Sequence, residues 1–185
     1  MIGIGLLLAG GAYYLYINQQ PEKVRLSTLT EAAATSSVVN VDSLRFDKLI
    51  PSAVGLVNDF GYYFTAQQAD TLSQIILQNE KKTSNQIAIV TFNSLPIDAQ
   101  DFDAFTKVLA NKWGVGQKDK NNGVTIALCK ALRKIRIQNG YGISNKLTDA
   151  NTKIIIDQVI FPEFIKGDYY IGIKKGLLKI IEVLQ

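Results

Sequence analysis

The chain has 185 residues, 47% of them hydrophobic and 19% charged, which is enough for one domain with its own core. It contains no histidine, so Ser-His-Asp and Cys-His catalytic systems and histidine zinc sites are excluded. The single cysteine, Cys129, excludes an intrachain disulfide and a CxxC redox pair, and we expect no disulfide-linked partner. Cys129 lies in the apolar run 124–129, where we expect a buried core residue.

The net charge of +4 comes from 20 basic and 16 acidic side chains. Basic residues gather in one stretch where only Asp119 opposes them: Lys118, Lys120, Lys130, Arg133, Lys134 and Arg136. No aromatic residues are interleaved with them and no nucleic-acid motif accompanies them, so we expect a solvated hairpin face and no nucleic-acid partner. An anionic partner is the alternative.

The first seventeen residues carry no charge, and the first charged residue is Glu22. At about 1.5 Å per residue, a helix over residues 1–20 would cross a hydrocarbon core of about 30 Å. Tyrosines at its end suit an interfacial aromatic belt. We therefore expect a single N-terminal transmembrane helix as an anchor, rather than a cleaved signal peptide, because a basic n-region and a cleavage site are missing.

Residues 21–48 are polar, rich in Ser, Thr, Ala and Val, and have no sustained period, which is typical of a tether. A short helix is expected within it, near residues 29–34. Lys23 and Arg25 follow the anchor directly and, taken alone, favour a cytoplasmic position for this side.

Residues 49–185 have the pattern of an α/β domain. Thr65 and Gln68 have the spacing of a capping box, and apolar residues then recur at helical spacing. Residues 86–92 form a β-branched run typical of a buried strand. Acidic residues at the start and a lysine at the end predict a second helix over 101–113.

The second half of this domain begins with two strands, 123–129 and 134–138, which we expect to pair as a hairpin with one wet face. Thr148 begins a third helix that Pro162 is expected to end, and Asp168 caps the last helix. The sequence therefore predicts a three-layer α/β/α sandwich with a small mixed sheet.

Several loops carry specific motifs in a fixed order: Val57-Asn58-Asp59-Phe60, Lys112-Trp113-Gly114-Val115-Gly116-Gln117-Lys118, Asn121-Asn122-Gly123-Val124, Arg136-Ile137-Gln138-Asn139-Gly140-Tyr141-Gly142, Leu147-Thr148-Asp149-Ala150, Phe161-Pro162-Glu163-Phe164 and Gly167-Asp168-Tyr169-Tyr170. Across about residues 50–184, their order and spacing resemble the TPM domain. The resemblance implies a three-layer α/β/α domain carried outside the cytoplasm. It also implies acid phosphatase activity or an accessory role at membrane complexes, with divalent-cation binding by the loop cluster.

Oxygen-bearing side chains stand in loops or at helix starts, beside turn-forming glycines: Asp59, Asp119, Asn121, Asn122, Asp149 and Asp168. Carboxylate and amide oxygens, with no nitrogen or sulfur donor among them, suit a hard cation such as Ca²⁺ or Mg²⁺. The resemblance singles out Asp59, Asp149 and Asp168 as ligands. Four further residues are expected to line the same site: Gly123, Gln138, Asn139 and Tyr141.

Structural roles compete with ligation at these positions. Helix capping alone would explain Asp149 and Asp168, and Asp59 would serve equally well to pin its loop. Where many TPM domains carry acids, this chain has Asn121 in one loop and Ser144 in another. Fewer carboxylates lower calcium affinity and make a two-metal phosphatase centre hard to assemble.

The sequence thus predicts a membrane-anchored, extracytoplasmic domain, in the periplasm or on the cell surface. We expect it to bind a divalent cation weakly and to act as an accessory or assembly factor for other envelope proteins. A metal-dependent acid phosphatase is one alternative. A protein-binding module without an ion is another.

Overall fold

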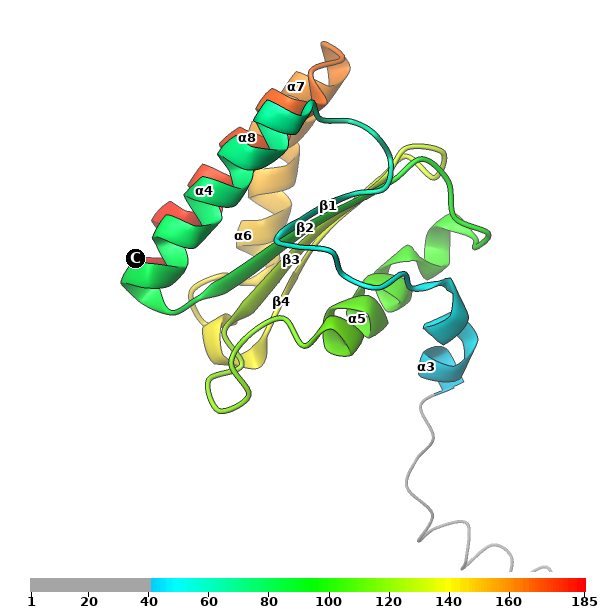
Figure 1. Cartoon of the computed structure of the whole chain (residues 1–185), viewed down its shortest axis with the longest axis horizontal. Helices are drawn as coiled ribbons and strands as arrows, with labels where there is room; N and C mark the ends of the chain where they lie inside the picture. Colours follow the sequence, from blue (N-terminus) through cyan, green and yellow to red (C-terminus); the bar gives the residue numbers. More distant parts are fainter. Residues whose placement is uncertain (1–40) are drawn as a thin grey trace, which may run out of the picture. The chain divides into compact units, whose positions relative to one another are not determined.

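The computed structural model describes residues 41–185, which are drawn in colour in Figure 1. The predicted anchor over 1–20 lies outside the described residues, as does the predicted tether up to residue 40 with its short helix near 29–34. Among the helices that residues 41–185 form, none is long and apolar enough to span a bilayer.

A four-stranded sheet forms the centre of the domain, in the order β1-β2-β3-β4. β1 (Val57–Asp59), β2 (Gln86–Phe92) and β3 (Gly123–Cys129) run parallel, and β4 (Lys134–Asn139) pairs with β3 in the antiparallel sense. The predicted mixed sheet and the hairpin are confirmed. β1 was not predicted, because three residues are too few to show a strand's alternation.

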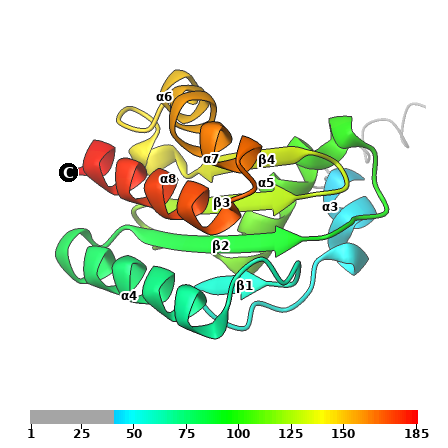
Figure 2. The same ribbon diagram turned by 90° about the horizontal axis from the view of Figure 1, so that it is seen from above.

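Helices cover both faces of this sheet (Figures 1 and 2). On one face lie α4 (Ala66–Thr83), α8 (Tyr169–Leu184) and the helical segment 149–165. On the other face lie α5 (Phe102–Trp113) and the short helices α3 (Val41–Phe46) and η1 (Asp47–Leu49). A further short helix, η2 (Ala99–Asp101), directly precedes α5.

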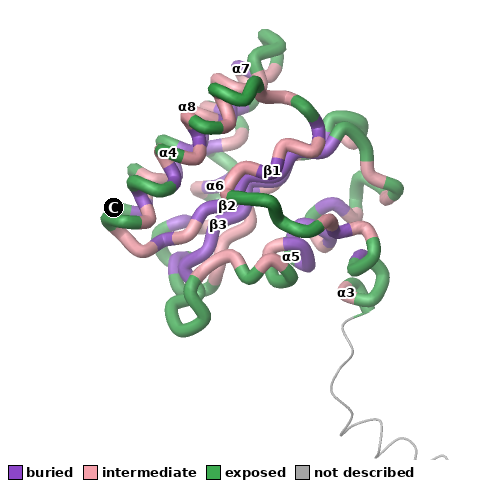
Figure 3. Tube along the Cα trace, viewed as in Figure 1, coloured by how far each residue is buried: buried purple, intermediate pink, exposed green. Residues whose placement is uncertain are grey.

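Two apolar clusters separate the layers. Leu72 and Leu177 pack on Ile89 and Ile126 in the first cluster, and Phe105 packs on the opposite face of the sheet in the second. β2 and β3 are buried along almost their whole length, as Figure 3 shows. This burial explains the three-layer arrangement, because a strand that is buried on both faces of the sheet needs a helix on each side.

Capping residues begin the long helices as predicted. The Thr65 side chain accepts a hydrogen bond from the Gln68 backbone N–H, and the Gln68 side chain accepts one from the Thr65 backbone, which completes the capping box of α4. Asp168 accepts from the Ile171 backbone N–H at 2.9 Å at the start of α8. Each cap satisfies backbone donors that the first turn of a helix leaves without partners.

The helix expected to end at Pro162 continues past it. α6 (Asp149–Ile154) is followed by a π-helical segment, η4 (Ile155–Ile160), and by α7 (Phe161–Ile165), in whose first turn Pro162 stands. A proline is tolerated in a first turn, where its missing N–H leaves no bond unmade. The π-helical turn therefore resets the hydrogen-bond pattern and allows the helix to pass the proline.

The folded unit begins before residue 49, where the predicted tether was expected to end. Phe46 is fully buried, with its ring 5.7 Å from that of Phe105 in an edge-to-face arrangement. Arg45 forms a 2.6 Å ion pair with Asp101. A single buried aromatic among polar residues has no periodicity, which is why the sequence did not reveal that this segment packs on the domain.

We expect Phe46→Ala to lower the free energy of unfolding by about 4 kcal/mol, because it leaves a cavity in the aromatic cluster. Leu44→Ala, on the exposed side of the same helix, should change it by less than about 0.5 kcal/mol. Urea denaturation followed by circular dichroism measures both. Equal effects would show that α3 does not pack on the domain.

Candidate functional site

A cleft of about 570 Å³ that many polar residues line lies where β3 begins and β4 ends, beside α5 and the start of α6. Six of the ten predicted site residues line it: Asn121, Gly123, Gln138, Asn139, Tyr141 and Asp149. Several other residues that were not predicted as site residues also line it: Asp103, Lys107, Asn111, Thr125, Arg136 and Ser144. Loops far apart in the sequence thus meet at one place.

Close backbone contacts hold these loops together. A Cβ atom at Gly123 would lie 1.9 Å from the Val115 carbonyl oxygen, and one at Gly140 would lie 2.1 Å from the Asn121 carbonyl oxygen. The Gly140 N–H donates to the Gly123 carbonyl at 2.8 Å, and the Gly142 N–H donates to the Asn121 carbonyl at 3.0 Å. Glycine is therefore required at Gly123 and Gly140, because backbone passes where a side chain would stand.

Asn122, one of the predicted ligands, is directed into the protein and not into the cleft. Its side-chain oxygen accepts from the Gln117 N–H at 2.8 Å, and its amide nitrogen donates to the Ser84 carbonyl at 2.7 Å. It is almost fully buried. Both ends of the amide are thus occupied in fixing the loop before β3 to the end of α4.

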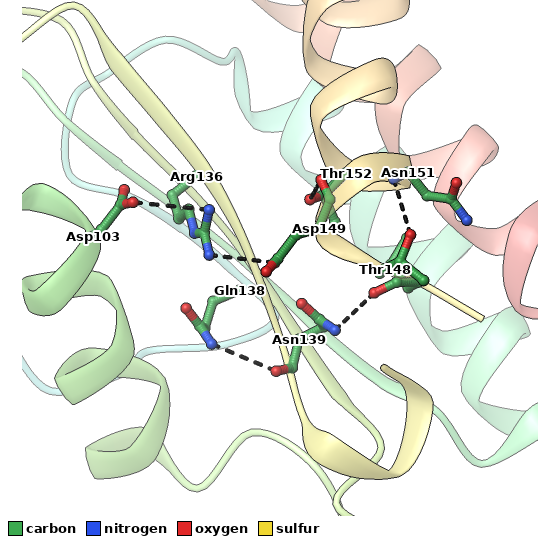
Figure 4. Close-up of polar contacts among 9 residues, drawn as sticks. Asp103, Arg136, Gln138, Asn139, Thr148, Asp149, Asn151 and Thr152 are labelled. Atoms are coloured by element: carbon green, nitrogen blue, oxygen red, sulfur yellow. Dashed lines mark hydrogen bonds and ion pairs between the residues drawn. The ribbon is translucent and has the colours of Figure 1, made fainter. Parts of the chain in front are cut away.

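Arg136 lies between two carboxylates in the cleft (Figure 4). Its guanidinium nitrogens are 3.8 Å from Asp103 Oδ2 and 3.7 Å from Asp149 Oδ1. At these distances the contacts are ion pairs, because they are too long to be hydrogen bonds. Thr148 caps α6 by accepting from the Asn151 N–H at 3.1 Å, so Asp149 is free of the capping role and its side chain is 86% exposed.

Two polar groups at the cleft have no hydrogen-bond partner among the described residues. They are Thr125 Oγ1 and Arg136 Nε, both buried. A buried donor without a partner is destabilising by about 1–3 kcal/mol, so such groups are uncommon unless a ligand or water completes them. The sequence did contain a signal for Arg136. Arg136 and Gln138 are two residues apart in a strand, so both side chains lie on the same face of β4.

Asp59 lies at the other end of the sheet. It pairs in register with Thr91 near the carboxyl end of β2, whereas the cleft is at the amino end of β3. Its carboxylate accepts from the backbone N–H groups of Tyr63 at 3.0 Å and Phe64 at 2.8 Å, and from the Thr91 hydroxyl. These bonds pin the loop after β1, which is the alternative role that the sequence left open for Asp59.

The remaining predicted ligands also lie outside the cleft. Asp168 caps α8, beside Tyr169, whose ring centroid is 4.9 Å from that of Tyr63. Asp119 lies on an exposed turn. The six predicted ligands are therefore distributed over both ends of the sheet, and Asp149 and Asn121 are the two that share the cleft.

Tyr63, beside Tyr169 at the far end of the sheet, has a shifted pKa. Burial of its phenol raises this pKa to about 12.

The donor set of the cleft has few carboxylates. In the part of the chain that the structure describes, no three acidic, histidine or cysteine side chains are grouped to hold a metal ion. The cleft offers Asp103 and Asp149 together with the amide oxygens of Asn121, Gln138 and Asn139. This all-oxygen set matches the preference of Ca²⁺ and Mg²⁺, with two carboxylates where tight calcium sites use more.

Comparison with known protein families matches residues 57–183 to the TPM domain. The chain belongs to the TPM-domain family. The match covers the whole sheet and extends into α8, so the strands and the cleft described above lie within the TPM domain.

Similar solved structures come from bacteria. The N-terminal domain of a P. gingivalis protein is 30% identical, with a TM-score of 0.62, over 70% of this chain and 81% of that one. The BA42 protein of Bizionia argentinensis is 24% identical, with a TM-score of 0.55, over 66% and 81%. The N-terminal domain of the cg2496 protein of Corynebacterium glutamicum, at 17% identity with a TM-score of 0.51 over 73% and 84%, shares the fold. A comparison with curated proteins found no match.

We expect Asp59→Asn to lower the free energy of unfolding by about 2 kcal/mol, because an amide nitrogen cannot accept the backbone N–H that the lost oxygen accepted. Asp119→Asn, on the exposed turn, should change it by less than about 0.5 kcal/mol. Urea denaturation measures both. An Asp59→Asn protein of unchanged stability and weakened calcium binding would return Asp59 to the ligand set.

Proposed function

We propose that this TPM domain is held outside the cytoplasm by the apolar N-terminal segment and binds a divalent cation weakly in the cleft. In this role it acts as an accessory or assembly factor for envelope membrane proteins. The observation that carries the cation proposal is the pair of carboxylates, Asp103 and Asp149, that flank Arg136 in an oxygen-lined cleft.

The chemistry of the cleft supports calcium or magnesium over other metals. Hard cations take carboxylate, amide and backbone oxygens, and neither a histidine nor an exposed cysteine stands among the residues lining the cleft. Arg136 competes with an incoming cation for both carboxylates, since its positive charge lies within 4 Å of each. A cation would have to displace these ion pairs, which makes weak binding the expected outcome.

The membrane part of the proposal is supported by the sequence. Residues 1–17 carry no charge, and the polar residues that follow lead into α3, where the folded unit begins. Outside the cytoplasm, the domain would reach neighbouring membrane proteins without entering the bilayer. Partners would then be selected by the exposed surfaces of the domain.

Calcium titration of the full-length protein in detergent micelles should give saturable binding with a dissociation constant in the millimolar range. Asp149→Asn should weaken it about tenfold, because a carboxylate ligand is lost, and Arg136→Gln should tighten it about tenfold, because a competing positive charge is removed. Amide shifts in NMR spectra measure the site and the affinity together, and shifts should concentrate at Asn121 and Asn139.

Asp119→Asn is the matched control, since it removes an acidic charge outside the cleft and should leave the titration unchanged. Loss of a negative charge at Asp149 and of a positive charge at Arg136 would change calcium affinity in opposite directions under general electrostatics too, so the unchanged titration of Asp119→Asn is what identifies a ligand role. If 10 mM calcium, about ten times the expected dissociation constant, caused no amide shifts, the cation proposal would be wrong. The domain would then be a protein-binding module without an ion.

A second function, metal-dependent acid phosphatase, is favoured by the unpartnered groups on the cleft wall. Arg136 Nε and Thr125 Oγ1 are buried donors without partners among the described residues, and Lys107 lines the same cleft. These are the groups that would bind phosphoryl oxygens and stabilise their charge as the phosphate ester is broken. A bound cation would add to that stabilisation.

If this second function holds, the protein will hydrolyse p-nitrophenyl phosphate with Mg²⁺, Mn²⁺ or Ca²⁺ present. Arg136→Gln should then reduce kcat/KM by about a hundredfold, because the charge that stabilises the transition state is lost. The same variant tightens calcium under the first proposal, so one substitution distinguishes the two. Hydrolysis that Arg136→Gln leaves unchanged would place the activity elsewhere.

A further inference from the structure

The opposite end of the sheet from the cleft carries a surface that combines exposed apolar and basic side chains. The turn of the β3–β4 hairpin, residues 130–133, leads into β4, and α7 lies against it across a groove of about 230 Å³. We call this surface the hairpin–α7 patch. Five exposed side chains define it: Lys130, Arg133, Lys134, Phe161 and Ile165.

The apolar part of the patch consists of two exposed side chains on α7. Phe161 is 53% exposed and Ile165 is 73% exposed, and they stand one turn apart on the same side of α7. Residues spaced by four on a helix share a face. Together with the groove, the two side chains form a contiguous apolar surface, the feature that marks interaction sites when it is large enough.

The basic part of the patch has few opposing charges. Arg133 and Lys134 form no ion pair within residues 41–185, and Lys130 lies over the rings of Tyr63 and Tyr169, at 5.9 Å and 5.7 Å from their centroids. The nearby acid on α7, Glu163, is nine-tenths buried and is paired to two lysines at 3.1 Å and 2.6 Å. The patch therefore presents positive charge on the hairpin beside apolar side chains on α7.

Two exposed residues at this end of the sheet have a left-handed backbone conformation. Arg133 has φ 51° and Tyr62, which is 88% exposed in the loop after β1, has φ 57°. Glycine or asparagine would adopt this left-handed conformation with less strain than arginine or tyrosine. Both side chains are exposed, so packing does not explain the choice of residue at either position, although Ser84 and Asn121 near the cleft have positive φ as well.

The chain enters the folded unit at this end. Phe46 at the end of α3 packs on Phe105, Phe105 packs on Phe92 at 5.7 Å, and the Phe92 carbonyl accepts from the Lys130 N–H at 3.1 Å. The residues between the apolar N-terminal segment and α3, 21–40, can span at most about 70 Å. A membrane bound by that segment would therefore lie within reach of the patch.

We propose that the hairpin–α7 patch docks on the anionic phospholipid surface of the membrane that holds the chain, with Phe161 and Ile165 entering the headgroup region. Apolar side chains beside a row of basic ones match the two components of such a surface. The proposal rests on the membrane anchoring proposed above. Tethering raises the local concentration of lipid surface, so a patch of low intrinsic affinity is sufficient.

The test uses the full-length protein with the fluorophore NBD on Ala131→Cys, an exposed and uncharged position in the hairpin turn. Gln78→Cys, exposed near the far end of α4, carries the same label as the control position, and Cys129 is buried. The protein is reconstituted into phosphatidylcholine vesicles with and without 30% phosphatidylglycerol. Flotation measures membrane binding, and the NBD emission wavelength measures docking.

Docking predicts a blue shift of NBD at position 131, and none at position 78, in the anionic vesicles alone, and high salt should reverse it. Arg133→Asn with Lys134→Gln should lower the docked-to-undocked ratio about 25-fold, at about fivefold for each charge. Lys81→Gln with Lys82→Gln removes the same charge at the far end of α4 and should leave the ratio unchanged.

Arg133→Asn also relieves the left-handed strain, so that variant should unfold at the same or a higher temperature, which separates lost docking from lost folding. Flotation with both vesicle types but no shift at position 131 would overturn docking and leave anchoring intact. Flotation with anionic vesicles alone would support docking and overturn anchoring. Failure to float with either would overturn both.

Discussion

Parallel pairing of β2 with β3 determines where the other elements of the domain lie. Both strands are buried along almost their whole length, and their side chains alternate between the two apolar clusters. Two parallel strands need a long crossover, and burial on both faces needs helices on both sides. α5 provides the crossover, and the loop that returns from it passes so close to Gly123 that no side chain fits there. The cleft is therefore a direct consequence of the crossover, since its loop walls are the returning chain and the end of β4.

The two surfaces that we assign to function lie at opposite ends of one strand. β4 begins at Lys134, opposite Cys129, and ends at Asn139, opposite Val124, so it spans about 17 Å between the hairpin–α7 patch and the cleft. Arg136 lies between them and is directed toward α5, where it meets Asp103. Because the two surfaces share no side chain among those that line them, binding at one leaves the donor set of the other unchanged. The proposed membrane contact and the proposed cation binding can therefore be tested separately by substitution.

The elements that the sequence revealed are those with strong local periodicity. The two long strands, the capping box at Thr65 and the cap at Asp168 appear as predicted, because each depends on neighbouring residues. Contacts between distant residues were harder to predict. The start of a helix near Asp149 was predicted, but nothing local indicates that this helix start and Asp59, at the end of β1, lie at opposite ends of the sheet. Asp103 was hidden in the same way, since an acid in the first turn of α5 already had an explanation in the helix dipole.

Some of the basic residues of β4 can be explained by protection of the sheet edge, with no binding partner required. β4 is an edge strand, and charged side chains on an edge prevent pairing with the sheet of another molecule. Lys134 and Arg136 both serve in this way, whatever else they bind. Arg133 differs, because it lies in the turn outside the strand and adopts a backbone conformation that favours glycine or asparagine. Protection of the edge requires neither an arginine there nor the exposed Phe161 across the groove. Those two residues are therefore the strongest structural argument that this end of the domain meets another surface.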